Sequence, residues 1–184
     1  MTHLLFFDVE TTGVSKERDR VVQIAWILAN SRGESLEEKS YILKPENFYI
    51  PPAATNIHGI SQEIALKKGV ARGAVFREYV EAAASSSGIV AHNIDFDVGF
   101  VQAECRLLGL PISFEDKQKQ CTMRSSTTFC EIPHSNGRNG YKWPKLEELH
   151  FKLYNEHFSG AHDALVDVQI TKKCYFELKR LGVI

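Results

Sequence analysis

Two carboxylates stand two residues apart at the end of an apolar run near the start of the chain. Residues 4–13 read LLFFDVETTG, so Asp8 and Glu10 are separated by Val9. In an extended strand, residues two apart point to the same face and lie roughly 6.5–7 Å apart. Carboxylates this close repel each other, and one of them keeps its proton with a raised pKa unless a cation lies between them. The pair indicates a metal site, although two solvated carboxylates at a strand end would give the same pattern.

A third carboxylate lies in a second stretch, residues 90–97 (VAHNIDFD), where a short apolar run passes into a helical pattern. Asp95 stands directly ahead of the apolar-periodic part, at a position typical of a helix N-cap. Asp97 lies between Phe96 and Val98. A bare charge so close to buried surface is costly without a partner, which makes Asp97 a candidate member of a site.

The third stretch, residues 160–171 (GAHDALVDVQIT), places Asp167 within an apolar helical pattern. Positions five apart differ by about 140° around a helix axis, so His162 approaches Asp167 only from the loop that enters the helix. Gly160 favours such a loop. Asp163 is four residues before Asp167, and we expect it to be a first-turn or capping residue that complements the helix dipole.

Elements of both kinds must position these residues. Strands are expected at residues 3–8, 21–29, 39–43 and 88–92, the first three as an antiparallel meander. Helices are expected after Ser61 and at residues 74–84, 96–108, 122–129, 146–154 and 164–181. Pro51-Pro52 is expected to end the extended region, and residues 112–145 show a poor pattern apart from the short helix. The order predicts an α/β fold with a mixed central sheet flanked by helices, in a single domain over residues 1–184.

Composition limits the possible classes of protein. The chain has 184 residues, of which 43% are hydrophobic and 24% charged, as in an ordinary globular domain. No apolar run reaches the roughly 18 residues of a membrane helix and the first residues lack a secretion signal, so a cytoplasmic protein with no membrane partner is expected. The formal charge of −1 does not indicate a nucleic-acid binder, so such a partner would be held by local groups or metal ions. The widely spaced cysteines form no CxxC pair and are expected to be reduced and packed: Cys105, Cys121, Cys130 and Cys174.

In this order, DVETTG, HNIDFD and HDALVD resemble the three exonuclease motifs of the DEDDh family. Its members include the epsilon proofreading subunit of bacterial replicative DNA polymerase, ribonuclease T and oligoribonuclease. The resemblance spans residues 4–175 and implies the ribonuclease H-like exonuclease fold. The segment Ile57-His58-Gly59-Ile60 also resembles one that epsilon-like members carry between the first two motifs.

The resemblance implies a role for each motif residue. Asp8, Glu10, Asp97 and Asp167 become catalytic metal ligands, and His162 becomes the general base. Two divalent cations, Mg²⁺ or Mn²⁺, are implied; such hard ions prefer oxygen ligands and, about 3.5–4 Å apart, can hold both the attacking and the leaving oxygen. Histidine, with an unperturbed pKa near 6.5, suits removal of a proton from water. The expected substrate-binding residues are Thr11, Thr12, Ile57, His58, His92 and Phe96.

Three functions follow from the resemblance. The first is an epsilon-like proofreading or repair exonuclease that releases nucleoside monophosphates from single-stranded or frayed DNA 3′ ends. The second is an RNA-trimming exonuclease of the ribonuclease T or oligoribonuclease type, and the third a non-catalytic polymerase-accessory subunit. DNA is favoured over RNA because Ile57–Ile60 is epsilon-like. A polymerase partner is possible, but no tether is visible after the last helix, so a freestanding enzyme is expected.

Residues 134–145 (HSNGRNGYKWPK) combine charge with aromatic groups. The basic and aromatic residues are Arg138, Tyr141, Lys142, Trp143 and Lys145. Such a mixture can follow a single strand by charge and stack its bases. A polar surface loop with Trp143 packed on the core would also give this pattern.

Overall fold

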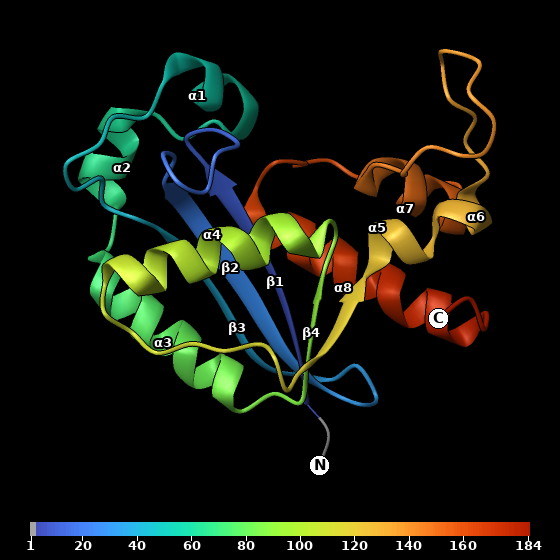
Figure 1. Cartoon of the computed structure of the whole chain (residues 1–184), viewed down its shortest axis with the longest axis horizontal. Coiled ribbons are helices and arrows are strands. Elements are labelled where there is room, and N and C mark those ends of the chain that lie inside the picture. The colour runs from blue at the N-terminus through green and yellow to red at the C-terminus, as the bar shows by residue number, and fades with distance from the viewer. Residues whose placement is uncertain (1–2) are drawn as a thin grey trace.

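The apolar run at the start of the chain forms the middle strand of a five-stranded sheet (Figure 1). The computed structural model describes residues 3–184. The sheet has the order β3-β2-β1-β4-β5, with β1 (His3–Thr11), β2 (Val21–Asn30), β3 (Ser35–Ile42), β4 (Gly88–Ala91) and β5 (Gln118–Cys121). The pairs β1–β2 and β2–β3 are antiparallel, whereas β1–β4 and β4–β5 are parallel. The predicted meander and mixed sheet are confirmed.

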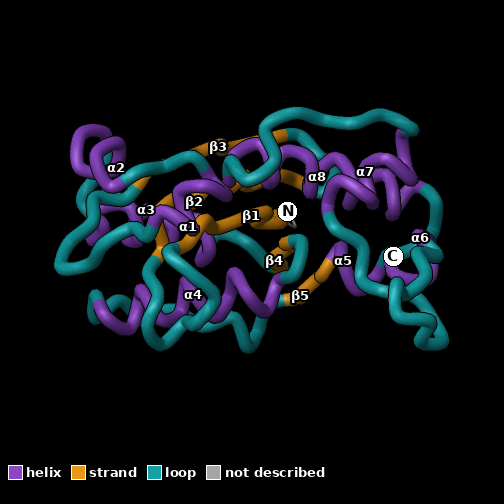
Figure 2. Tube along the Cα trace, turned by 90° about the horizontal axis from the view of Figure 1, so that it is seen from above, coloured by secondary structure: helices purple, strands orange, loops and turns teal. Residues whose placement is uncertain are grey.

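Helices cover both faces of the sheet. They are α1 (Pro52–His58), α2 (Gln62–Lys68), α3 (Arg72–Ala84), α4 (Ile94–Leu107), α5 (Thr122–Ser125), α6 (Thr127–Cys130), α7 (Leu146–Tyr154) and α8 (Ala164–Arg180). Side chains alternate across β1. Leu5, Phe7 and Val9 therefore join the core formed with α3 and α4, whereas Leu4 and Phe6 pack with α8. Figure 2 shows α4 and α8 on opposite sides of the strands.

One end of β1 is open on the side of its parallel neighbour. Strand β4 pairs with β1 at Leu4, Leu5 and Phe6, whereas β2 follows β1 to Thr11. Beyond Phe6 the backbone of β1 is therefore free for other partners on the β4 side. The carboxylate of Asp97, in the first turn of α4, is one such partner, because its Oδ1 accepts a hydrogen bond from the Val9 N–H at 3.2 Å. The candidate carboxylates gather at this open end.

Several element predictions need correction. Pro52 does not simply end the extended region but begins α1, because a proline is tolerated where the helix has no use for its missing N–H. The strand predicted at 39–43 begins at Ser35. The helix predicted at 122–129 is divided between α5 and α6. The poorly patterned region also contains β5, whose sequence QKQC is polar and whose place is fixed by pairing with β4.

The start of α4 also differs from the prediction. Its N-cap is Asn93, which has a left-handed backbone conformation (φ 79°) that asparagine tolerates better than most residues. Asp95 lies inside the first turn, and its carboxylate pairs with Arg124. The prediction of Asp95 as the cap is therefore wrong.

Other predictions hold. Helix 146–154 is observed as expected, and the last helix ends one residue earlier than predicted. All four cysteines are buried and unpaired. Within residues 3–184, no helix is both long and apolar enough to cross a membrane.

Candidate active site

The first turn of α8 is fixed to the sheet by a buried glutamine. Gln23 on β2 lies opposite Glu10 on β1, so both point to the α8 face. Its Oε1 accepts a hydrogen bond from the Ala164 N–H at 3.2 Å, and its Nε2 donates to Asp163 Oδ2 at 3.4 Å. Asp163 is the N-cap that the sequence predicts. Its Oδ1 accepts hydrogen bonds from the N–H groups of Leu165 and Val166 at 3.0 and 3.3 Å. Gln23 therefore sets the position of Asp167 one turn later.

His162 reaches Asp167 from the loop, as its position before the helix predicts. His162 (φ 67°) and Gly160 (φ 87°) both have left-handed backbone conformations, which turn the chain sharply into α8. The His162 N–H donates to Asp167 Oδ2 at 2.9 Å. A ring nitrogen of His162 and carboxylate oxygens of Glu10 and Asp167 all lie within 4.8 Å of one another. Residues from two of the motifs thus meet in one cluster.

All four predicted metal ligands have raised pKa values. Burial raises the pKa of Asp8 well above its usual range, and repulsion by Asp97, Asp167, Glu10 and Asp163 adds to it. Burial also raises the pKa of Asp97 well above its usual range. Burial, and then the charges of Asp167 and Asp163, raise the pKa of Glu10 to about 8, whereas burial raises that of Asp167 to about 6. A divalent cation would relieve the repulsion between these carboxylates, and hard cations prefer oxygen ligands. The four residues therefore fit a site for such ions.

Two hollows adjoin the carboxylates. The first, of about 310 Å³, is lined by Asp8, His92, Lys145, Leu146, Glu147, Phe158, Ala161, His162 and Asp167. The second, of about 280 Å³, is lined by Val9, Glu10, Thr11, Thr12, Gly13, Val14, Ala53, Ala54, Ile57, His58 and Phe96. Every predicted substrate-binding residue therefore borders one of the two. The unexpected helix α1 is what brings Ile57 and His58 to the second hollow.

His58 has an unused donor in the second hollow. Its Nδ1 accepts a hydrogen bond from the Ile60 N–H at 3.1 Å, so the neutral ring carries its proton on Nε2. Burial lowers the pKa of His58, which favours this neutral form. Among the described residues the buried Nε2 has no hydrogen-bond partner. A ligand in the hollow would satisfy it.

The two threonines shape the wall of that hollow. Thr12 Oγ1 donates to Asp19 Oδ1 at 3.1 Å and accepts from the Arg20 N–H at 3.0 Å. Thr11 Oγ1 donates to the Gly13 carbonyl at 2.5 Å. Both hydroxyls thus hold the β1–β2 turn, and contact with a ligand would come from the other side-chain and backbone atoms.

His92 braces the first hollow. Its Nε2 donates to the Pro144 carbonyl at 3.0 Å, which leaves Nδ1 as the acceptor for the Thr122 hydroxyl at 3.0 Å. Burial lowers the pKa of His92 to about 4, so the ring stays neutral. Any substrate contact through a ring nitrogen would have to replace one of these bonds. The contacts join the end of β4 to α5 and to the segment before α7.

Sequence reasoning missed Gln23, Val14 and Glu147, which all belong to the site. Gln23 gives a signal, because it is the single polar residue among the nonpolar residues of the segment VVQIAWILA. Val14, whose side chain is 86% exposed, borders the second hollow but looks like any turn residue in the sequence. Glu147 lines the first hollow from the start of α7, where no motif marks it, whereas its neighbour in that wall, Lys145, belongs to the basic and aromatic segment 134–145.

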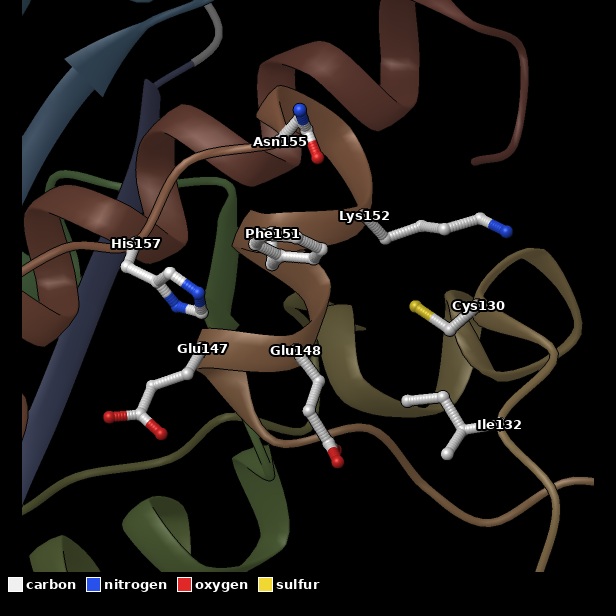
Figure 3. Close-up of a pocket in the computed structure, with 8 residues that line it drawn as sticks. All are labelled: Cys130, Ile132, Glu147, Glu148, Phe151, Lys152, Asn155 and His157. Carbon is white, nitrogen blue, oxygen red and sulfur yellow. The ribbon is translucent and has the colours of Figure 1, made fainter.

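A larger hollow, of about 550 Å³, lies on another side of α7 (Figure 3). Its walls are Cys130, Ile132, Glu147, Glu148, Phe151, Lys152, Asn155 and His157. Phe151 stacks on His157 with ring centroids 4.7 Å apart. None of the three motifs contributes to these walls, so size alone does not identify the catalytic site.

The motifs, the sheet order and the carboxylate cluster together define a DEDD-type 3′-to-5′ exonuclease with a ribonuclease H-like fold. The family model RNase_T, described as exonuclease, matches residues 5–175, and the chain belongs to this family. The predicted family and fold are thereby confirmed.

The similar proteins include a subunit of a bacterial DNA polymerase and a phage exonuclease. DNA polymerase III subunit epsilon of Salmonella typhimurium is 27% identical over 191 residues, which cover 97% of this chain and 72% of that protein. The "Uncharacterized exonuclease CP81" of Escherichia phage 186 is 30% identical over 175 residues, covering 91% of this chain and 83% of that one. The structure of Escherichia coli exonuclease I with a dT13 oligonucleotide superposes with a TM-score of 0.81 at 22% identity. The match covers 99% of this chain but 43% of exonuclease I, and this likeness concerns the fold.

Proposed function

We propose that the chain is a two-metal 3′-to-5′ exonuclease that releases nucleoside monophosphates from DNA 3′ ends, in an epsilon-like proofreading or repair role. The observation that carries the proposal is the meeting of Glu10, His162 and Asp167 within 4.8 Å, beside the half-buried Asp8 and the buried Asp97. The choice of DNA is supported by the epsilon-like segment Ile57–Ile60, which borders the second hollow, and by the relative named DNA polymerase III subunit epsilon.

Asp8, Glu10, Asp97 and Asp167 would hold the divalent cations, Mg²⁺ or Mn²⁺. Ions of this kind bind phosphate oxygens and offset the negative charge that develops when a phosphodiester is hydrolysed. In metal-free protein burial, and then repulsion by neighbouring carboxylates, raises the pKa values of these four groups. Metal binding would release their remaining protons.

His162 is the proposed general base. A water oxygen attacks the phosphorus of the last phosphodiester while a ring nitrogen of His162 takes its proton, and the bond from phosphorus to the 3′ oxygen breaks. The 3′ oxygen leaves with the shortened strand and acquires a proton from solvent. The His162 side chain is exposed, so it can pass its proton on, and the hydrogen bond from its N–H to Asp167 Oδ2 keeps the loop in place.

The second hollow would hold the terminal nucleotide. The exposed side chains of Val14 and Ile57 and the ring of Phe96 offer apolar contact to a base, and the His58 Nε2–H offers one donor to an oxygen of the nucleotide. These contacts orient the last phosphodiester toward the first hollow, where Asp8, His162 and Asp167 lie.

The test is hydrolysis of single strands by the purified chain. A 5′-labelled DNA 12-mer and an RNA 12-mer of the same sequence are incubated with Mn²⁺ or Mg²⁺, and products are resolved by length. We expect stepwise shortening of the DNA from its 3′ end, faster than that of the RNA, and no activity in the Asp167→Asn variant. Faster shortening of RNA would favour the ribonuclease alternative, and no shortening of either strand would overturn the proposal.

A further inference from the structure

The segment just before α7 carries a row of exposed side chains that the proposed catalytic chemistry does not use. Tyr141 is 42% exposed, Trp143 is 58% exposed, and Lys145 is exposed as well. The two residues between them have other partners. Lys142 Nζ donates a hydrogen bond to Glu148 Oε1 at 2.6 Å. Pro144 is buried, and its carbonyl accepts a hydrogen bond from His92. This alternation is that of an extended chain, so the three exposed side chains lie on one face about 6.5–7 Å apart. We call Tyr141, Trp143 and Lys145 the aromatic strip.

Trp143 is held ready for contact on one side. The Arg124 guanidinium lies over its ring, with Cζ 5.5 Å from the centroid, and Arg124 in turn pairs with Asp95. These contacts restrain the indole without burying it. Since an exposed tryptophan ring costs free energy in water, a ring kept both exposed and restrained is suited to stacking on a ligand.

The aromatic strip is continuous with the catalytic hollow. Lys145 lines that hollow together with Asp8 and His162. Tyr141 and Trp143 line a neighbouring hollow of about 550 Å³, to which Arg138 also contributes. In Figure 1 the loop between α6 and α7 projects past the end of the sheet at which α1 lies. A chain leaving the catalytic hollow along Lys145 therefore meets the two aromatic rings next.

We propose that the aromatic strip is a stacking platform for the nucleotides on the 5′ side of the terminal one, the part of the single strand that remains bound after each cleavage. The proposal rests on the proposed function and adds to it a site for the retained strand. The bases stack on Trp143 and Tyr141, and the phosphates approach Lys145 and Arg138. Lys142, which the sequence placed among the strand-binding residues, is engaged with Glu148 and supports the strip from behind. Stacking of this kind tolerates any base, as an exonuclease requires.

The experiment compares a long and a short substrate. The long one is an oligo(dT) 12-mer, and the short one is the p-nitrophenyl ester of thymidine 5′-monophosphate, which is sized for the catalytic hollows and too short to stack on Trp143 and Tyr141. Trp143→Ala should raise the KM for the 12-mer roughly 5- to 100-fold and leave hydrolysis of the ester unchanged. Tyr141→Ala should act in the same direction. Phe151→Ala is the matched control, because Phe151 is 42% exposed but lines the hollow of Figure 3.

Fluorescence gives a readout independent of turnover. The chain has two tryptophans, and Trp26 is fully buried, so added oligonucleotide should quench the emission of Trp143. The 12-mer in Ca²⁺ should quench strongly and thymidine 5′-monophosphate weakly. Quenching by the 12-mer without hydrolysis of either substrate would leave the platform standing while the proposed function fails. An unchanged KM in Trp143→Ala, an equal loss on both substrates, or an equal loss in Phe151→Ala would overturn the platform.

Discussion

Replacing Glu10 by glutamine should stabilise the metal-free protein at high pH while abolishing hydrolysis. Glu10 is 9% exposed, and burial together with the charges of Asp167 and Asp163 raises its pKa from 4.5 to about 8. The folded protein therefore binds more protons than the unfolded chain between about pH 4.5 and pH 8. Stability must then fall as pH rises through this window. Glutamine has nearly the same shape and does not ionise, so the variant lacks the loss of stability that ionisation of Glu10 causes as pH rises.

The size of the effect follows from the pKa. The pKa of Glu10 rises from 4.5 in the unfolded chain to about 8 in the folded protein. At about 1.36 kcal/mol for each pKa unit, ionised Glu10 lowers the free energy of unfolding by at most roughly 5 kcal/mol at pH 8. Water entry and small side-chain movements reduce such a penalty, so we expect Glu10→Gln to raise the free energy of unfolding by about 2 kcal/mol at pH 8. For a chain of this length that is an increase in Tm of about 4–8 °C. At pH 5 the difference should fall below about 1 kcal/mol, because Glu10 is then protonated in the folded protein.

Urea unfolding in EDTA, followed by circular dichroism at pH 5 and pH 8, measures this difference. Comparing the two pH values cancels the cost of fitting an amide in place of a carboxyl group. Glu81→Gln, at an exposed position on α3, is the matched control and should change little. With Mg²⁺ the wild type should gain more stability than Glu10→Gln, since the variant lacks one of the proposed ligands. A variant no more stable than the wild type at pH 8, or equally stabilised at both pH values, would refute the account of the carboxylate cluster.

Three further changes test other parts of the site. His162→Ala should lower kcat about 10²- to 10⁴-fold in steady-state assays with little change in Mn²⁺ affinity by calorimetry; lost Mn²⁺ binding would make His162 a ligand instead of the base. Gln23→Leu should lower the free energy of unfolding by about 1–3 kcal/mol in urea and kcat as well, because Ala164 loses its acceptor; wild-type kcat would remove the positioning role. Glu104→Gln should cost about 3–5 kcal/mol in the same urea titration, since it leaves the buried Arg72 without its carboxylate; a loss under about 1 kcal/mol would contradict this.

The parts of the fold that could be predicted are those decided by local pattern. The continuous apolar runs of β1 and β2 and the apolar period of α7 and α8 each identify their element, because burial on the sheet or against a helix face requires that spacing. Partners far along the chain decide the rest. Strand β5 has the sequence QKQC and exists because β4 offers it a parallel edge.

The candidate site shows the same division. The residue types and order of the three motifs indicate chemistry without the structure, as does the loop position of His162. What His92 does depends on Thr122 and Pro144, which are 30 and 52 residues away, and no spacing in the sequence reports those contacts. The charge of Lys142 indicated phosphate binding, but its carboxylate partner Glu148 comes from the first turn of α7.

The four carboxylates stay close together only if the elements that carry them are fixed. Hydrogen bonds on each face of the sheet fix these elements. On the α8 face, Gln23 anchors the helix that carries Asp167. On the other face, Glu104 accepts hydrogen bonds from the Val21 N–H at 3.0 Å and from Arg20, which fixes the end of the β1–β2 turn. Mutations in these supports should therefore lower stability and activity together. Replacement of Glu10 by glutamine should lower activity but raise metal-free stability, and this difference in sign separates residues that hold the site from a residue that acts in it.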